Sequence, residues 1–241
     1  MSPGLLLHLS GLQFWGGPQG GNTRTSHPHP TRSGITGLLA AAQGRPRGSD
    51  LTDLDTLTHT LRVDRPGQLL LDFHTVGGGY PKHLTAATAA GGHRGNALIY
   101  KDWYLHDAAF TVALTGPAPL IEDLTQALQK PVYPPHLGRR SCRPDTPLLL
   151  TPTPVHDALS ALDQLPLHRT PPRTGDTVPV TYLHEHPPAP GAPPTRILDD
   201  APRPGRTFTT RPIWETTRHL PASLCHGHGT GYLNALTQHR T

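Results

Sequence analysis

Proline is distributed very unevenly along this chain of 241 residues. Of its 29 prolines, 20 lie after position 130. Proline has no backbone N–H and fixes φ at about −65°, so closely spaced prolines disfavour long helices and central strands. We therefore expect most of the regular structure in residues 1–130 and a loop-rich remainder. Proline and glycine together account for 54 of the 241 residues, which is below the level typical of overall disorder.

The first half of the chain alternates between strand-like and helix-like patterns. Residues 5–9 form a short apolar run that is typical of a strand. From Ile35 onward, apolar residues recur at i, i+3, i+4 and i+7, which predicts a helix over residues 33–43. Ser33 is the expected N-cap and Gly44 the expected stop.

Further elements follow in the same alternating order. Strands are predicted over 57–63, 69–76, 107–114 and 132–137, with a turn at 65–67 and a helix carrying Leu120, Leu124 and Leu128. Residues 77–96 are polar, rich in glycine, alanine and threonine, and read as a mobile excursion or a long hairpin. The predicted fold class is therefore α+β, with a ferredoxin-like (RRM-related) βαββαβ core.

Fewer elements are expected beyond residue 150. The spacing of Val155, Leu159 and Leu162 predicts a short third helix. Late strands are expected over 178–183 and 207–214. Between them, the proline-rich segment 187–204 is expected to lack regular structure.

The charge of the chain favours a polyanionic partner. The formal net charge is +4, supplied by 18 arginines and only 3 lysines. Arginine is the better residue for two-point phosphate contacts. Cys142 and Cys225 are the only cysteines, which favours a reduced protein over a disulfide framework. The sequence has no run of about 18 apolar residues, so no membrane span is expected. The N-terminus lacks the basic start of a signal peptide.

Two basic turns are candidate phosphate contacts. Arg32 precedes Ser33 and Gly34 at the start of the predicted helix, where free N–H groups and the helix dipole attract anions. The second turn is the segment 138–141, in which two adjacent arginines follow a glycine. Taken alone, the first turn is better explained as the start of an ordinary buried helix, and the second as a solvated arginine pair.

Three other groups of residues are candidates for chemistry. His74 follows Asp72 at a strand end and is either structural or a ligand contact. Tyr80, Lys82 and His83 have the side chains that metal-free RNA cleavage requires, although a loop does not preorganise a site. The segment 225–228 carries a cysteine and two histidines but lacks a second ligand pair at zinc spacing.

Several segments, in one order along the chain, resemble a known family. They are 6–16 with Gly11 and Trp15, 30–34 with 37–39, 72–76, 104–114, Lys130 with Pro131, and 136–142. Covering roughly residues 5–150, they resemble the CasD family, the subunit of the type I-E CRISPR Cascade that holds the 5′ handle of the guide RNA.

The resemblance implies a ferredoxin-like RNA-binding domain over residues 1–150, with a β-hairpin thumb at about 77–103. A loop-rich, proline-rich extension, residues 151–241, is expected to pack on it. The resemblance also implies a non-catalytic, cytoplasmic subunit in antiviral defence. This subunit would cap the backbone filament and contact no membrane. The implied partners are the crRNA, the backbone and large subunits of Cascade and, through the complex, target DNA; no cofactor or metal is implied.

The basic turns and the resemblance together assign the site residues. RNA binding is expected at Thr31, Arg32, Ser33, Gly34, His74, Thr75, Lys101, Gly138, Arg139, Arg140 and Ser141. Thumb contacts to guide and target are expected at Tyr80, Lys82, His83 and Arg94. Trp15, Phe14 and Trp103 are candidate stacking surfaces, although burial is the simpler expectation for Trp15. The alternative function is a metal-independent endoribonuclease that uses Tyr80, Lys82, His83 or His74.

Overall fold

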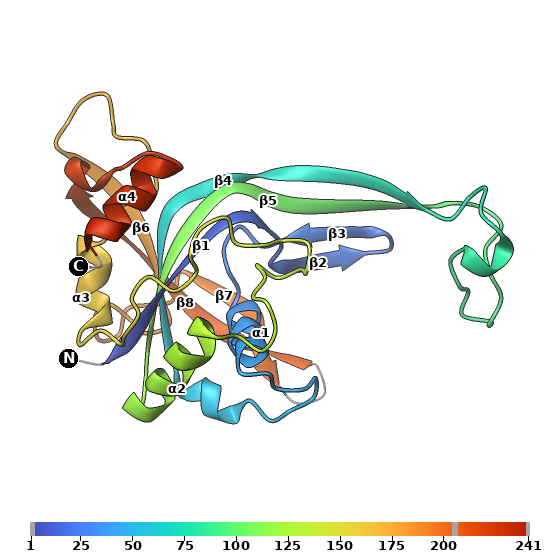
Figure 1. Ribbon diagram of the computed structural model, residues 1–241, viewed down its shortest axis with the longest axis horizontal. Coiled ribbons are helices and arrows are strands. Elements are labelled where there is room, and N and C mark those ends of the chain that lie inside the picture. Colours follow the sequence, from blue (N-terminus) through green and yellow to red (C-terminus); the bar gives the residue numbers. More distant parts are fainter. Residues whose placement is uncertain (1–2, 204–206, 240–241) are drawn as a thin grey trace.

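The computed structural model describes residues 3–203 and 207–239, which form a mixed α+β fold around one curled sheet (Figure 1). The strands are β1 (Gly4–Gln13), β2 (Gly16–Gly20), β3 (Thr23–Ser26), β4 (Thr58–Val76), β5 (Leu98–Thr115), β6 (Thr177–His184), β7 (Arg196–Arg203) and β8 (Thr207–Pro221). The α-helices are α1 (Arg32–Ala42), α2 (Ala118–Gln129), α3 (Ala158–Gln164) and α4 (Thr230–His239). None of these helices is long and apolar enough to cross a membrane.

The sheet contains strands from both halves of the chain. Its order is β2-β3-β5-β4-β6-β8-β7, and β1 pairs with β5. β5 is central: it pairs antiparallel with β4 along one side, and along the other it pairs antiparallel with β1 and then parallel with β3. β6 and β8 extend the same sheet beyond β4, so strands from before and after residue 150 belong to one continuous sheet.

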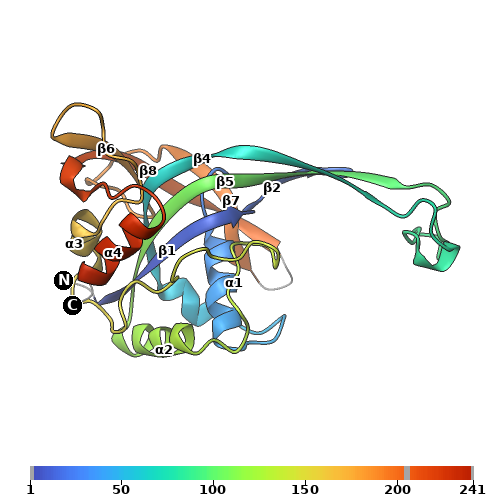
Figure 2. The same cartoon turned by 45° about the horizontal axis from the view of Figure 1, so that its top comes forward.

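Both faces of the central strands are buried. In β1, Leu5, Leu7 and Leu9 belong to the core that includes α1 and α2, whereas Leu6 belongs to the core that includes α3 and α4. A strand covered on both faces has no solvent-facing side, which explains the apolar run at residues 5–7. Figures 1 and 2 show α1 and α2 on one side of the sheet and α3 and α4 on the other.

Helix α1 agrees with its prediction to within one residue at either end, but its N-cap differs. Thr31 caps the helix, and its Oγ1 accepts a hydrogen bond from the Gly34 N–H at 3.2 Å. The predicted cap, Ser33, lies inside the first turn. The chain leaves the helix at Gly44, whose φ of +74° suits glycine.

Strands β4 and β5 form a long hairpin that projects from the body of the protein (Figures 1 and 2). The turn predicted at 65–67 is wrong: the pairing register shifts between Val63 and Arg65, and β4 continues through this bulge. The far half of β4 therefore belongs to the projection together with residues 77–103. Its tip contains a short 3₁₀ helix, Lys82–Leu84.

Three predicted elements differ from the structure. Residues 132–137 are not a strand, because three nearby prolines remove the N–H groups that a ladder needs. Instead, Leu150 and Val155 donate backbone hydrogen bonds to β1 at 2.9 and 2.8 Å. The third helix begins later than expected, after the N-cap Asp157.

The segment 187–204 is also more regular than predicted, because β7 lies within it and pairs with β8. Arg196 and Ile197, at the start of β7, follow the last of the closely spaced prolines. Pro204 and the last two residues of the chain lie outside the described residues.

A buried polar network joins the C-terminal helix to the sheet. His8 of β1 contacts Thr111 Oγ1 and the Tyr232 hydroxyl through Nδ1, both at 3.2 Å. Its Nε2 lies 3.0 Å from Nδ1 of His168, whose ring stacks on Tyr232 with the centroids 4.1 Å apart. All four side chains are buried, so the network holds α4 against the second core.

A buried ion pair lies beside this network. Arg62 Nε donates to Asp64 Oδ1 at 2.6 Å, and both side chains are fully buried. The same guanidinium also donates to the carbonyls of Leu165 and Pro166, at 3.0 and 2.8 Å. These bonds anchor the loop before His168 and offset the cost of burying the charge.

Candidate nucleic-acid interface

The start of α1 lies mostly inside the protein. Thr31 and Arg32 are 3% and 7% exposed, whereas Ser33 and Gly34 are partly exposed. A Cβ on Gly34 would lie 2.7 Å from the Trp15 ring, so the glycine allows close packing of helix and indole. Trp15 is buried, as expected, and donates its Nε1–H to Gln13 at 2.7 Å.

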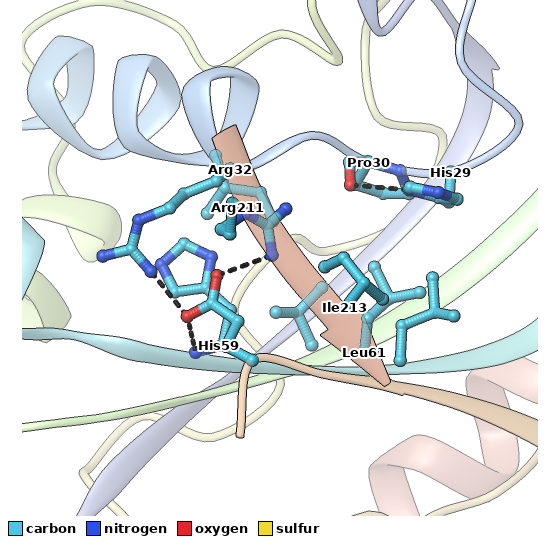
Figure 3. Close-up of a pocket in the computed structure, with 11 residues that line it drawn as sticks. His29, Pro30, Arg32, His59, Leu61, Arg211 and Ile213 are labelled. Carbon is cyan, nitrogen blue, oxygen red and sulfur yellow. Dashed lines mark hydrogen bonds and ion pairs between the residues drawn. The ribbon is translucent and has the colours of Figure 1, made fainter. Parts of the chain in front are cut away.

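The Arg32 guanidinium points into a small pocket rather than toward solvent (Figure 3). Its Nη1 pairs with Glu185 Oε2 at 2.5 Å, and its Nη2 donates to the carbonyls of Leu54, Asp55 and Leu57. Sequence reasoning placed this charge on a phosphate. The structure gives it an internal partner that lies 153 residues away in the chain.

Glu185 is the centre of that pocket. Besides Arg32, it accepts hydrogen bonds from Arg211 Nη1 and from the backbone N–H of His59, both at 3.0 Å. Burial alone would raise the pKa of Glu185, but the charges of His59, Arg32 and Arg211 outweigh burial and hold it below its ordinary value. This pocket ties α1 to the sheet and is structural.

The second basic turn, together with its flanking residues 137 and 142, is fixed by contacts with Phe14. The Phe14 N–H donates to the Leu137 carbonyl at 3.0 Å. Gly138 has a φ of +88°, and a Cβ at this position would lie only 1.7 Å from the Phe14 carbonyl oxygen. Only glycine fits here. The turn is thus held rigidly at the root of the hairpin, with Arg140 and Ser141 exposed.

Arg139 lies over two aromatic rings. Its guanidinium carbon is 3.7 Å from the centroid of the Phe14 ring and 5.3 Å from that of Tyr104. Nη1 donates to the Tyr104 hydroxyl at 2.8 Å and to Asp102 Oδ2 at 2.6 Å. The side chain stays 22% exposed. Such a stacked, partly exposed arginine suits a phosphate or a base.

Sequence reasoning missed Arg24 and Asp102, which complete this cluster. Arg24 donates to both oxygens of Asp102, at 2.7 and 2.8 Å, and lies 5.2 Å from the Tyr100 ring centroid. Burial alone would raise the pKa of Asp102, but hydrogen bonds from Arg139 and Arg24 keep it below its ordinary value. The sequence signal was weak because these residues are far apart in the chain.

His74 extends the same face of the hairpin toward its tip. Its ring stacks on Tyr100 with the centroids 5.5 Å apart, and Nδ1 lies 3.2 Å from Asp72 Oδ2. Asp72, His74 and Asp102 offer ligand atoms within 4.8 Å of one another, a possible metal geometry. Both oxygens of Asp102 are already bound by arginine, so these residues do not fit a metal without losing that pairing.

The remaining predicted residues also lie on the hairpin. Lys101 is exposed, and its backbone N–H donates to Asn22 at 3.0 Å. Thr75, next to His74, is also exposed. The predicted thumb contacts Tyr80, Lys82, His83 and Arg94 are all exposed and lie in the segment that joins β4 to β5. Figure 1 shows this segment at the far end of the projection.

The hairpin and the cluster at its root have the features of a protein that binds single-stranded nucleic acid. These features are a rigid turn and partly exposed guanidinium groups that lie over aromatic rings.

The chain belongs to the Cas5 family of CRISPR-associated proteins, since residues 4–219 match the family described as CRISPR-associated protein (Cas_Cas5). It is 39% identical over 168 residues to the CRISPR system Cascade subunit CasD of Escherichia coli (strain K12), covering 66% of this chain and 75% of the relative.

Solved structures agree with this family. The chain matches one from a CRISPR RNA-guided surveillance complex with a TM-score of 0.87 and 39% identity, covering 98% of both chains. It also matches the crystal structure of a Cas protein with a TM-score of 0.63 and 30% identity, covering 94% of this chain and 99% of the other. The resemblance drawn from the sequence motifs is thereby confirmed.

Proposed function

We propose that this chain is the CasD subunit of a Cascade surveillance complex and grips the 5′ handle of the crRNA. Its likeness to CasD and to a chain of an RNA-guided complex supports assembly with other Cascade subunits. The observation that carries the RNA grip is the Arg139 cluster, a stacked guanidinium on a turn that Gly138 holds rigid at the root of the hairpin.

In this proposal the handle backbone runs along the turn 137–142 and the polar face of the hairpin. Arg139 and Arg140 supply charge, and Gly138 and Ser141 allow close approach of the RNA. His74, Thr75 and Lys101 extend the path toward the tip. Ser33 and Gly34 border it at α1, while Thr31 and Arg32 support that helix end from inside.

We further propose that the core is ferredoxin-like. β1, α1, β4, β5 and α2 supply a βαββα order, and the backbone bonds of residues 148–155 to β1 supply an irregular last strand. The hairpin would be the thumb that lies across guide and target, through Tyr80, Lys82, His83 and Arg94. The body would cap the backbone filament and contact the large subunit.

We propose that the subunit is not a nuclease. Tyr80, Lys82 and His83 are exposed on a narrow tip, and no hydrogen bond joins their side chains among the described residues. Catalysis of RNA cleavage needs a base, an acid and a cation held in fixed positions. The tip does not supply such a frame.

A binding experiment tests the RNA grip. The full chain is titrated against guide RNA with a repeat-derived 5′ handle and against the same RNA with a scrambled handle. We expect tighter binding to the intact handle, and a shallower salt dependence for the Arg139→Ala, Arg140→Ala double variant. Equal affinity for both RNAs and an unchanged salt slope would refute the assignment.

A cleavage assay tests the alternative. Repeat RNA is incubated with the chain in EDTA, and we expect it to remain intact. Cleavage that His83→Ala abolishes would instead establish the endoribonuclease.

A further inference from the structure

Three neighbouring strands bring charged residues into one row at the root of the hairpin. Arg24 of β3 pairs in register with Asp102 of β5, and Asp72 of β4 faces Asp102 from the other side. Paired residues project to the same face of a sheet, so the three side chains are neighbours. Two carboxylates opposite each other are unfavourable unless cations lie between or beside them.

Asp102 meets that requirement by binding two arginines. Its side chain is 1% exposed, and its two oxygens accept three charge-assisted hydrogen bonds, from Arg24 Nε and Nη2 and from Arg139 Nη1. The two guanidinium groups come from different parts of the fold, β3 and the turn 137–142. A single buried carboxylate therefore sets the distance between them.

Each guanidinium is also held by an aromatic ring. Arg24 lies over Tyr100 and Arg139 over Phe14. A side chain fixed by both a carboxylate and a ring loses little conformational freedom when it binds a ligand. Both remain partly exposed, 34% for Arg24 and 22% for Arg139, so both can reach a ligand at the surface.

We propose that Asp102 is a positioning residue, holding Arg24 and Arg139 as a preformed pair that binds the phosphodiester backbone of single-stranded RNA. This inference rests on the proposed function and adds Arg24 to the RNA-binding residues. Asp102 itself does not touch the RNA, since a carboxylate repels phosphate. It acts through the two arginines.

The proposal and simple charge attraction predict opposite effects of neutralising Asp102 on the affinity for RNA. The two arginines and Asp102 sum to +1, and Asp102→Asn raises this sum to +2. If the arginines act only as charges, the variant binds RNA more tightly. If Asp102 positions them, the variant binds more weakly although the protein has become more basic.

A conservative variant of Arg24 gives a second test that preserves the charge. Arg24→Lys keeps the cation but loses the two-point bond to Asp102 and the position of the guanidinium over the Tyr100 ring. Arg218→Lys is the matched control. Arg218 likewise pairs with an aspartate, Asp163 at 2.7 Å, and lies 4.8 Å from a tyrosine ring, but on β8.

The experiment measures fluorescence anisotropy of a labelled, mixed-sequence single-stranded RNA, longer than the roughly 4–16 nucleotides of a typical site, against the full-length variants at several salt concentrations. We expect Asp102→Asn and Arg24→Lys each to weaken binding about tenfold, the effect of losing one charge-assisted contact. The control should bind as the wild type does.

Tighter or unchanged binding by Asp102→Asn, or unchanged binding by Arg24→Lys, would overturn the inference. Should Asp102→Asn fail to fold, Arg24→Lys alone decides. A wild-type chain that does not prefer the intact handle refutes the proposed function instead, so the two failures are distinguishable.

Discussion

The buried histidine network makes the stability of this protein depend on pH. Burial lowers the pKa of His8 from 6.5 to about 3 and that of His168 to about 4. Burial is the largest cause for both, and it outweighs the attraction of Asp64. The folded protein thus keeps both rings neutral at a pH where the unfolded chain already protonates them.

The sign and size follow from this difference. Below pH 6.5 the unfolded state binds more protons than the folded state, so stability falls as the pH is lowered. At pH 5.0 each histidine favours unfolding by about 2 kcal/mol relative to pH 7.5, since each pH unit below the unfolded pKa contributes about 1.4 kcal/mol. The pair together removes about 4 kcal/mol, a large share of the total stability of a typical domain.

Urea unfolding at pH 7.5 and pH 5.0 measures this loss. Lowered pKa values at His136 and His184, also due mainly to burial, act in the same direction, so a variant is needed to isolate the network. His168→Phe keeps a ring to stack on Tyr232 but cannot titrate. We expect it to reduce the pH-dependent loss by about 2 kcal/mol.

The pH dependence, rather than the absolute stability, is the quantity to compare, because His168→Phe also removes a hydrogen bond to His8. His219→Gln, which replaces an exposed histidine of β8, is the matched control and should keep the wild-type pH dependence. A wild-type loss below about 1 kcal/mol, or a full loss in His168→Phe, would refute this reasoning.

Three further predictions follow from the packing. Glu185→Gln should lower the free energy of unfolding in urea by about 3 kcal/mol, because it removes the buried carboxylate that pairs with both Arg32 and Arg211; an unchanged midpoint would contradict the buried-network assignment. Gly138→Ala should weaken RNA binding and lower the melting temperature, whereas Gly175→Ala, with similar φ but no neighbour within 4 Å, should cost only the backbone strain. Deleting residues 79–96 should leave the melting temperature unchanged and impair target engagement, and insoluble protein would show that the tip supports the core.

Local patterns predicted the first helix and the second basic turn well. The apolar spacing after Ile35 and the stop at Gly44 depend on neighbouring residues, so the sequence is sufficient there. Contacts between distant residues were not predictable. Arg32 of α1 pairs with Glu185, which follows β6, and Arg24 pairs with Asp102 across two strands; no local pattern records either contact.

The proline argument failed at β7 for a related reason. A strand that pairs along one side needs only half of its N–H groups, so a segment near prolines can still join an edge. By contrast, three prolines did prevent a strand over 132–137, and β1 pairs with residues 148–155 instead.

The pairing of β4 with β6 has a consequence for how the protein is made. Residues 60–63 of β4 pair with 181–184 of β6, which leave the ribosome much later. At ordinary rates of translation the edge of β4 waits roughly ten seconds for its neighbour. During that time, it offers free backbone groups to any other nascent chain. We therefore expect the sheet to close only near the end of synthesis, so that a ribosome stalled before β6 would release a chain prone to aggregate.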